Sequence, residues 1–432
     1  MRFIYVFLTY LLSPLYVLYW FCRALINPTY WDRLGQRLGF GYPVLSEGSI
    51  WIHAVSVGEV QATIPLVLAL QDRFPERQLL ITTVTPTGAE RAASLFDDDV
   101  LHCYIPLEIS FAIQNFFNSI KPDIALIIET EIWPNLYDAC GRREIPLILV
   151  NARISPQSAD RYRRFLPLLR ETLSHGVVIA AQSEVDADRF RSLGAAPERT
   201  WVIGNIKFDV ELPVEIESHG QMFREQNFSG RPVWIAASTH DNEEEQVLSA
   251  HRQLLKKIPE ALLILVPRHP ERFGTVRTLL RKKGFNYIVR TDDCPCCNDI
   301  DVFLGDTMGE LPLFYAASDI AFVGGTLVPI GGHNLLEPAA LGLPILTGPY
   351  LFNTPDIANM FSELGASIQI KDSTELADEV KKLFYDRGEA VQMGRKGRII
   401  VAENKGALPR FLDLMEPLVS QKSKGGKEKH PG

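Results

Sequence analysis

The sequence lacks an excess of positive charge. It holds 44 Lys and Arg residues against 52 Asp and Glu, a formal net charge of −8 at pH 7. Proteins that bind nucleic acid through a broad surface usually carry a basic excess instead. The charge balance therefore argues against a nucleic-acid partner.

Cysteine is also scarce, with six in 432 residues. Cys22, Cys103 and Cys140 stand alone, and the other three form a Cys-Pro-Cys-Cys run at 294–297. No pair has zinc-knuckle spacing, and a chain of this length needs no disulfides to hold a core together. We interpret the run, Cys294 to Cys297, as an irregular surface loop, and we expect a reducing, cytoplasmic environment.

Several catalytic signatures are missing. The chain contains no GxSxG elbow, no P-loop and no internal repeat with a period of 20–50 residues. Asp-x-Asp strings occur at 186–188 and 299–301, but neither follows a buried strand into a turn. We interpret them as solvated acids, and we expect no catalytic metal and no cofactor.

The first segment is strongly apolar. Residues 3–26 carry a single charge, Arg23. As a helix this segment is long enough to cross a hydrocarbon core about 30 Å thick. A hydrophobic helix that lies in the membrane interface without spanning it is the alternative, and the sequence leaves that choice open. Both alternatives predict a protein that sits at a membrane.

Basic residues suggest the orientation of this anchor. Arg23, Arg33 and Arg37 lie on its C-terminal side, whereas Arg2 alone precedes it. The positive-inside rule then places the rest of the chain in the cytoplasm. We therefore predict an inner-membrane protein with a single N-terminal anchor and its large domains on the cytoplasmic side.

Short apolar runs alternate with helical patterns after the anchor. The runs are β-branched and leucine-rich without in/out alternation, which is typical of parallel strands buried on both faces. We predict strands at 49–55, 78–84, 100–106, 123–129, 146–151 and 176–182, and then at 232–238, 261–267, 319–325 and 344–349. This alternation predicts an α/β fold with two Rossmann-like domains facing a cleft, the arrangement known as GT-B.

Composition also predicts the domain boundaries. We expect a membrane anchor at 1–30, a first Rossmann-like domain at 31–210, a linker at 211–231, a second Rossmann-like domain at 232–420 and a basic, disordered tail at 421–432. The linker prediction rests on a polar stretch bounded by Gly and Pro.

Candidate catalytic residues of the first half follow predicted strands. Glu59 opens a helix after the strand at 49–55, where an acid could act as a general base or could simply favour the helix dipole. Glu129 and Glu131 follow the strand at 123–129, and spacing alone does not assign which faces the cleft and which caps the next helix. Arg153 is a structural partner for either, and Lys207 is a candidate cation near the end of the half.

Candidate phosphate-binding residues gather in the second half. Arg268 and His269 follow a strand, and Arg suits bidentate phosphate contact. Glycine pairs at 324–325 and 331–332 let the backbone approach a ligand. A helix start after His333, with Glu337 in its first turn, predicts an anion and ribose site. Another helix start lies at 308–310, on the same face.

As a set, these motifs resemble the bacterial 3-deoxy-D-manno-octulosonic acid (Kdo) transferases. The matching pieces occur in consistent order between residues 30 and 355, and they are YWDRLGQRLGF, WIHAVSVGEV, ITTVTPTGAERA, ETEIWPN, NARIS, GNIKFD, PRHPERF, DTMGEL, GGHNLLEPA and GPYLFN. The resemblance implies a GT-B glycosyltransferase anchored in the inner membrane. It implies CMP-Kdo as donor and a lipid A precursor, lipid IVA, as acceptor.

The resemblance also implies roles for single residues. Glu59 matches the family's catalytic base, and Glu129 and Lys207 match positions that stabilise the transition state. The donor-binding positions are Arg268, His269, Gly309, Glu310, Leu311, Asn334, Leu335, Leu336 and Glu337. A GT-B epimerase, a transferase with a UDP donor and a non-catalytic binding protein are the alternatives. The anchor argues against the first, and the presence of Glu59 argues against the last.

Overall fold

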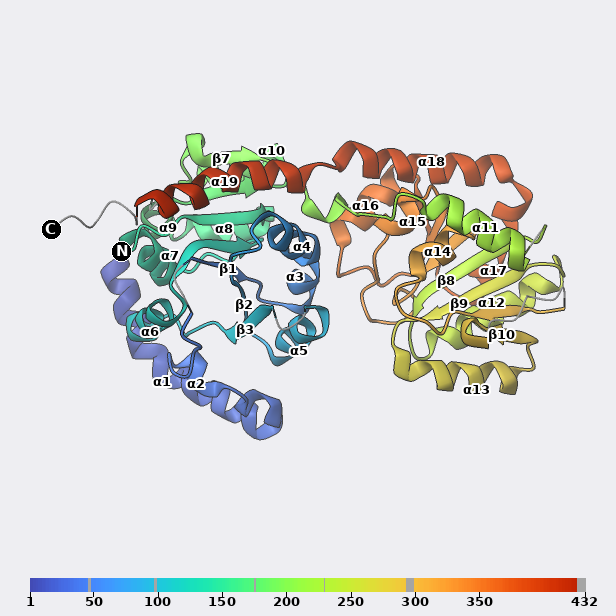
Figure 1. The fold of residues 1–432 in the computed structure, drawn as a ribbon, viewed down its shortest axis with the longest axis horizontal. Coiled ribbons are helices and arrows are strands. Elements are labelled where there is room, and N and C mark those ends of the chain that lie inside the picture. The colour runs from blue at the N-terminus through green and yellow to red at the C-terminus, as the bar shows by residue number, and fades with distance from the viewer. Residues whose placement is uncertain (46–47, 97–98, 175, 229, 293–298, 426–432) are drawn as a thin grey trace. The chain divides into compact units, whose positions relative to one another are not determined.

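The structure is a computed structural model that describes residues 1–45, 48–96, 99–174, 176–228, 230–292 and 299–425. It contains two compact units (Figure 1). Unit 1 is Met1–Asp209 with Asn404–Gly432, and unit 2 is Val210–Glu403. The cysteine run at 294–297 lies outside the described residues.

Unit 1 is built on a parallel sheet of seven strands in the order β3-β2-β1-β4-β5-β6-β7. The strands are β1 (Ser49–His53), β2 (Leu79–Thr83), β3 (Val100–Tyr104), β4 (Pro122–Ile128), β5 (Leu147–Ala152), β6 (Val178–Ala181) and β7 (Thr200–Val202). The strand order changes direction between β1 and β4. In a Rossmann-like sheet this switch point is where ligands bind, at the carboxyl ends of the strands.

Helices cover the sheet of unit 1. They are α1 (Arg2–Ile26), α2 (Leu34–Arg37), α3 (Val57–Ala62), α4 (Ile64–Arg73), α5 (Pro86–Leu95), α6 (Ser110–Ile120), α7 (Pro134–Arg142), α8 (Pro156–Arg163), α9 (Leu166–Leu173), α10 (Glu184–Ser192) and α19 (Ala407–Gly425), with short 3-10 helices η1 (Pro28–Trp31), η2 (Pro197–Arg199) and η3 (Ile206–Phe208).

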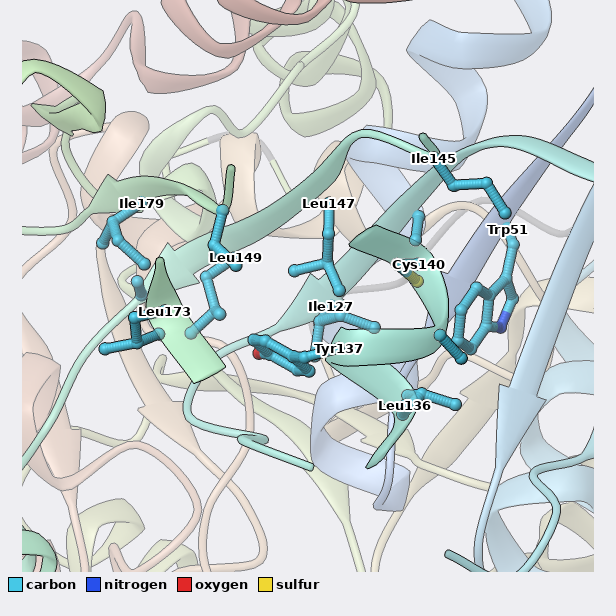
Figure 2. Close-up of a cluster of buried hydrophobic side chains, with 14 of the residues drawn as sticks. Trp51, Ile127, Leu136, Tyr137, Cys140, Ile145, Leu147, Leu149, Leu173 and Ile179 are labelled. Atoms are coloured by element: carbon cyan, nitrogen blue, oxygen red, sulfur yellow. The ribbon is translucent and has the colours of Figure 1, made fainter. Parts of the chain in front are cut away.

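Both faces of this sheet are buried, as the continuous apolar runs predict. Trp51, Ile127 and Leu149 belong to one buried cluster, which Figure 2 shows beside Tyr137 and Cys140 of α7. Their sequence neighbours point to the opposite face, because successive side chains of a strand alternate. That second face is covered in part by Phe411 and Met415 of α19.

The C-terminal helix α19 thus belongs to unit 1, although residues 232–420 were predicted as one domain. Asp209 accepts hydrogen bonds from the Gly406 and Leu408 N–H groups, at 2.5 and 2.7 Å, and so holds the start of this helix. The physical reason for the assignment is the apolar stripe of α19, which covers sheet residues of unit 1.

Unit 2 repeats the architecture with the strand order β10-β11-β9-β8-β12-β13-β14. Its parallel strands are β8 (Val233–Thr239), β9 (Leu262–Pro267), β10 (Tyr287–Val289), β11 (Val302–Leu304), β12 (Ile320–Val323), β13 (Ile345–Thr347) and β14 (Ser367–Gln369). Its helices are α11 (Ile216–Phe228), α12 (Glu243–Leu255), α13 (Phe273–Lys283), α14 (Leu311–Ala316), α15 (Leu336–Ala340), α16 (Pro355–Glu363), α17 (Ser373–Tyr385) and α18 (Arg387–Asn404), with η4 (Pro270–Arg272) and η5 (Arg290–Asp292). The switch point lies between β8 and β12.

The segment predicted as a linker, 211–231, contains helix α11. Ile216 and Phe228 are buried in the core of unit 2, and Arg224 pairs with Asp319 at 2.7 Å. A helix that buries few of its residues has a mostly polar sequence, so composition alone does not distinguish it from a linker.

The predicted anchor is a continuous helix, α1. Among the described residues it is the one helix long and apolar enough to cross a membrane. Its ends contact the body of unit 1: Arg2 pairs with Asp138 of α7, and the Arg37 guanidinium lies 4.0 Å from the ring centroid of Trp20.

Candidate active site

Glu59 lies at the switch point of unit 1, in the first turn of α3. Ser56 is the N-cap of this helix and accepts a hydrogen bond from the Glu59 N–H. The carboxylate in turn accepts from the Val55 N–H at 2.7 Å and from the Ser56 hydroxyl at 3.0 Å. This reciprocal arrangement resembles a capping box and holds the side chain in one position.

The environment of Glu59 makes it a weak acid. Burial raises its pKa to about 7, and the nearby Glu129 and Glu131 carboxylates add to the rise, against the opposing hydrogen bonds from Val55 and Ser56. A carboxyl group with a pKa near neutrality can exchange a proton under physiological conditions.

Glu129 follows β4, the strand next to β1, and pairs with two cations. Lys207 Nζ lies 3.1 Å from Glu129 Oε1, and Arg153 Nε lies 3.9 Å from Oε2. Glu129 has a φ of 61°, a left-handed conformation that is uncommon for a residue other than glycine. The structure thus brings together three of the predicted residues, namely Glu59, Glu129 and Lys207.

Glu131 points elsewhere. Its carboxylate accepts a hydrogen bond from the Trp133 indole at 2.7 Å, and burial raises its pKa. Neither it nor Glu129 caps α7, as the spacing had suggested one of them would. Glu108 does so instead, because it accepts from the Asn135 and Leu136 N–H groups at 2.7 and 3.2 Å.

Asn151, to which the sequence assigned no role, positions Lys207. It is fully buried with a φ of 54°, and its side-chain oxygen accepts from the Ile206 N–H at 3.1 Å. That bond fixes the start of η3, which carries Lys207. Asn151 lies within the matching NARIS piece, but its partner Ile206 is distant from it in the sequence.

In unit 2 the glycine-rich loop after β12 is held by a buried acid. Glu243, at the start of α12, accepts hydrogen bonds from the N–H groups of Gly325, Thr326 and Leu327 at 2.7–3.0 Å, and from His240 at 3.2 Å. The side chain is fully buried. Burial raises the pKa of Glu243, and the four donors oppose that rise.

The amides after Gly324 are therefore occupied by a side chain of the protein itself. The prediction that this first glycine pair allows close approach to a ligand does not hold for these three N–H groups. A run of acids such as that at 243–245 is favourable in the first turn of a helix, but sequence alone does not show which acid turns into the loop.

Three histidines lie together beside the predicted phosphate-binding arginine. His240 Nε2 is 2.7 Å from His333 Nε2, and the His240 and His269 rings are 5.4 Å apart. Burial lowers the pKa of His240 to about 4, and the nearby His269, Arg268 and Arg272 lower it further. At neutral pH His240 is thus uncharged and can share a proton with His333.

Glu337 lies near Arg268, and Asn334 orients it. The Asn334 amide donates to Glu337 Oε1 at 3.0 Å and accepts from the Leu336 N–H at 2.9 Å. Burial raises the pKa of Glu337, while the Asn334 hydrogen bond and the Arg268 charge counteract the rise. Leu335 and Leu336 are only 2% and 3% exposed, so these two residues can contact a ligand only through their backbone atoms.

The third predicted donor segment is shaped by an ion pair. Arg290 contacts both oxygens of Glu310, at 2.9–3.2 Å, so that carboxylate is already engaged. Gly309, with φ +84°, has open space where a side chain would be. Leu311 begins α14 and is half-buried.

The described residues hold no group of three His, Cys, Asp or Glu arranged to bind a metal ion. Three of the four Asp-x-Asp acids have structural partners for their carboxylates. Asp186 accepts from the Ile154 N–H at 3.0 Å, Asp188 pairs with Arg191 at 2.8 Å, and Asp301 accepts from the Asn286 N–H at 3.0 Å.

Two parallel Rossmann-like units, each with polar side chains at its switch point, define a glycosyltransferase fold of the GT-B class. Among solved structures, the glycotransferase of kitacinnamycin matches with a TM-score of 0.50 and 15% identity, covering 87% of this chain and 100% of that one. This likeness concerns the fold alone.

Sequence comparisons define the family. The 3-deoxy-D-manno-octulosonic acid transferase of Haemophilus influenzae is 42% identical over 429 residues, which cover 97% of this chain and 99% of that protein. A family model described as 3-deoxy-D-manno-octulosonic-acid transferase matches residues 32–210. The C-terminal CMP-Kdo binding domain of WaaA from Acinetobacter baumannii is 33% identical and covers 43% of this chain and 97% of that one, with a TM-score of 0.41. The chain belongs to the Kdo transferase family and is a glycosyltransferase.

Proposed function

We propose that this protein transfers Kdo from CMP-Kdo to a lipid A precursor, lipid IVA, with inversion at the anomeric carbon and with Glu59 as general base. The observation that carries the base assignment is a carboxyl group with a pKa of about 7 at the carboxyl end of β1, next to the sheet's switch point. Family membership supports the sugar, and the 33% sequence identity to a CMP-Kdo binding domain supports the nucleotide.

The proposed reaction requires one proton transfer and one leaving group. The acceptor hydroxyl gives its proton to Glu59 as its oxygen bonds to the anomeric carbon of Kdo. The bond from that carbon to the CMP phosphate oxygen breaks, and the electron pair leaves with CMP. A phosphate ester is a stable leaving group, so no separate strong acid is needed.

We propose that basic side chains bind the two acidic groups of the donor, the CMP phosphate and the Kdo carboxylate. Arg268 and His269 of unit 2 contact the CMP phosphate, and Lys207 of unit 1 contacts the Kdo carboxylate together with Glu129, which holds its ammonium group. Glu337 and Asn334 accept from ribose hydroxyls. Backbone atoms of Leu335, Leu336 and Gly309 complete the donor site, with Glu310 and Leu311 shaping it.

The experiment that tests the proposal measures CMP release from CMP-Kdo with and without a tetraacylated lipid A precursor, with mass analysis of the lipid. We expect acceptor-dependent release and a lipid heavier by one or more Kdo residues. Release without any lipid product would contradict the acceptor assignment, and binding of CMP without turnover would contradict the enzymatic proposal.

The transfer rate should depend on pH through Glu59. Because a general base must be ionised, kcat/KM is expected to rise with pH through an apparent pKa of about 7 and to be lost on the acid side. A pH–rate profile between pH 5 and 9 measures this. An acid limb near the ordinary glutamate pKa of about 4.3 would contradict the assignment.

Replacing Lys207 by alanine should lower kcat about ten-fold, because one charge-assisted contact to the donor carboxylate, worth about 1.5 kcal/mol, is lost. Lys207→Arg keeps the charge and should restore most of the rate. Single-turnover kinetics with saturating CMP-Kdo measure both. Equal rates for alanine and arginine would show that the Lys207 charge does not act in the reaction.

The helix α1 is proposed to attach the protein to the inner membrane, with both units on the cytoplasmic side. Its contacts at both ends with the body of unit 1 favour the interfacial arrangement over a membrane crossing. Its outward side chains support this. They are apolar, they recur at helical spacing and they are 56–86% exposed, as in Phe3, Ile4, Phe7, Leu11, Leu18, Leu25 and Ile26.

A further inference from the structure

A pocket lies between α1 and the body of unit 1. Its volume is about 690 Å³, within the range of small-molecule sites. One wall is the inner face of α1, from Tyr5 to Trp20, and the opposite wall comes from residues 105–109 and 132–133. Most of the lining is apolar, so its natural occupant is an apolar group.

Two groups of contacts hold α1 against the body of unit 1 on either side of the pocket. Near its start the Tyr5 hydroxyl donates to Glu108, and the Asn135 amide donates to Thr9. At its other end, Trp20 stacks on Arg37. The tyrosine hydroxyl and the Glu108 carboxylate satisfy each other, which removes two polar groups from the pocket wall.

The pocket wall continues into the carboxylate cluster. Trp133, in the wall, donates its indole N–H to Glu131. Val84, also in the wall, donates its N–H to the Val55 carbonyl at 3.4 Å, and the Val55 N–H donates to Glu59. The pocket wall is thus linked by hydrogen bonds to Glu131 and, through Val55, to Glu59, the acid to which we assign the role of base.

A buried cation in the pocket wall indicates the charge of the occupant. Arg37 is 3% exposed, and its guanidinium lies between the rings of Trp20 and Tyr104, 4.0 and 4.1 Å from their centroids. Within the described part of the chain, its Nε and one Nη make no hydrogen bond. A buried charge whose hydrogen-bonding capacity is unfilled favours an anionic ligand.

From these contacts we propose that the pocket binds one acyl chain of an anionic lipid, namely the acceptor. The identity of that lipid as acceptor rests on the proposed function. The outward apolar face of α1 lies against the membrane, so a chain can pass from the bilayer into the pocket beside the helix. The polar end of the lipid then faces Arg37, and its sugar reaches Glu59.

Two adjacent leucines of α1 form a matched test. Leu12 lines the pocket, whereas Leu11 does not, and both are similarly exposed at 51% and 59%. Leu12→Trp should fill the pocket and raise KM for the tetraacylated acceptor about ten-fold. This change corresponds to the free energy lost when roughly two methylene groups of the acyl chain are no longer buried. Leu11→Trp should leave KM unchanged. With an O-deacylated acceptor, the two variants should behave alike.

A binding measurement separates this proposal from the proposed function. Full-length protein should bind palmitate more tightly than palmityl alcohol, and Leu12→Trp but not Leu11→Trp should weaken palmitate binding. Leu8→Trp, with Phe7→Trp as its control, repeats the test if Leu12→Trp unfolds at a lower temperature than wild type.

The outcomes are distinct. Normal transfer with identical KM values for Leu12→Trp and Leu11→Trp would overturn the pocket proposal and leave the proposed function intact. Palmitate binding that Leu12→Trp weakens, in a protein that shows no Kdo transfer, would contradict the proposed function and the acceptor assignment, while supporting a lipid site.

Discussion

Replacing Glu59 by glutamine is expected to lower the rate of Kdo transfer by a factor of about 10²–10⁴, the usual contribution of a general base. Glutamine keeps the size of the side chain and can still accept from the Val55 N–H, so the local structure should survive. Binding of CMP should be unchanged, because the donor-binding residues are assigned to unit 2. Single-turnover transfer and CMP titration measure the two effects.

Glu131→Gln is the matched control. It lies in the same carboxylate cluster, but its oxygen accepts from the Trp133 indole, and a glutamine oxygen can do the same. We expect a change of less than about ten-fold, within what a single neutral hydrogen bond contributes. If Glu59→Gln turned over normally, or if both variants lost the same activity, Glu59 would not be the base.

Stability measurements give an independent check that Glu59→Gln folds. The pKa of Glu59 is about 7 in the folded protein, above its ordinary value of 4.5, so the folded state binds the extra proton between these values. The stability that this proton confers is present below about pH 4.5 and is lost as pH rises through 7. Glutamine does not titrate, so the stability of Glu59→Gln relative to wild type should increase as the pH rises from 5 to 8.

The second large effect concerns Glu243. Its replacement by glutamine should lower the free energy of unfolding of unit 2 by about 2–4 kcal/mol. All four N–H donors lose a charged acceptor, and the two that share one carboxylate oxygen then face either a neutral oxygen or a side-chain NH2 group that cannot accept. Urea unfolding measures the stability. Hydrogen exchange at residues 325–327 should accelerate, since these amides are the bonded ones.

Glu245→Gln is the control for that change. It lies on the same helix, two residues along, and is exposed, so its charge is solvated and its loss should change stability by less than about 0.5 kcal/mol. Slow exchange at 325–327 in Glu243→Gln would contradict the role assigned to the carboxylate. Donor KM should rise with the loosening of the loop.

Long buried strands were predictable from sequence, and four of the five three-residue strands were not. The exception is β13, which lies within the longer predicted run at 344–349. Runs such as those that became β1, β4, β8 and β9 are apolar over most of their length, because both sheet faces are covered. The strands β7, β10, β11 and β14 have three residues each, too few for any periodicity to be read. Their place in the sheets depends on neighbouring strands.

The sequence likewise did not show to which unit α19 and α11 belong. Both helices have amphipathic patterns. Such a pattern indicates that one face of the helix is buried, but it does not indicate against which sheet that face packs. Phe411 and Met415 are buried in unit 1, although the preceding helix α18 belongs to unit 2. Such a return of the chain is decided by packing between segments that are distant in sequence.

By itself, the sequence determined the family, the repetition of a parallel α/β pattern and the positions of Glu59, Glu129 and Arg268 after strands, because these depend on local order along the chain. Only the tertiary structure decided which groups meet. It pairs Lys207 with Glu129, turns Glu243 into the glycine-rich loop and fastens α1 by Tyr5 and Arg37 over a pocket. The physical reason is that ion pairs, hydrogen bonds and cavities form between residues far apart in the chain. Their strength depends on burial and distance, and neither quantity is written in local sequence.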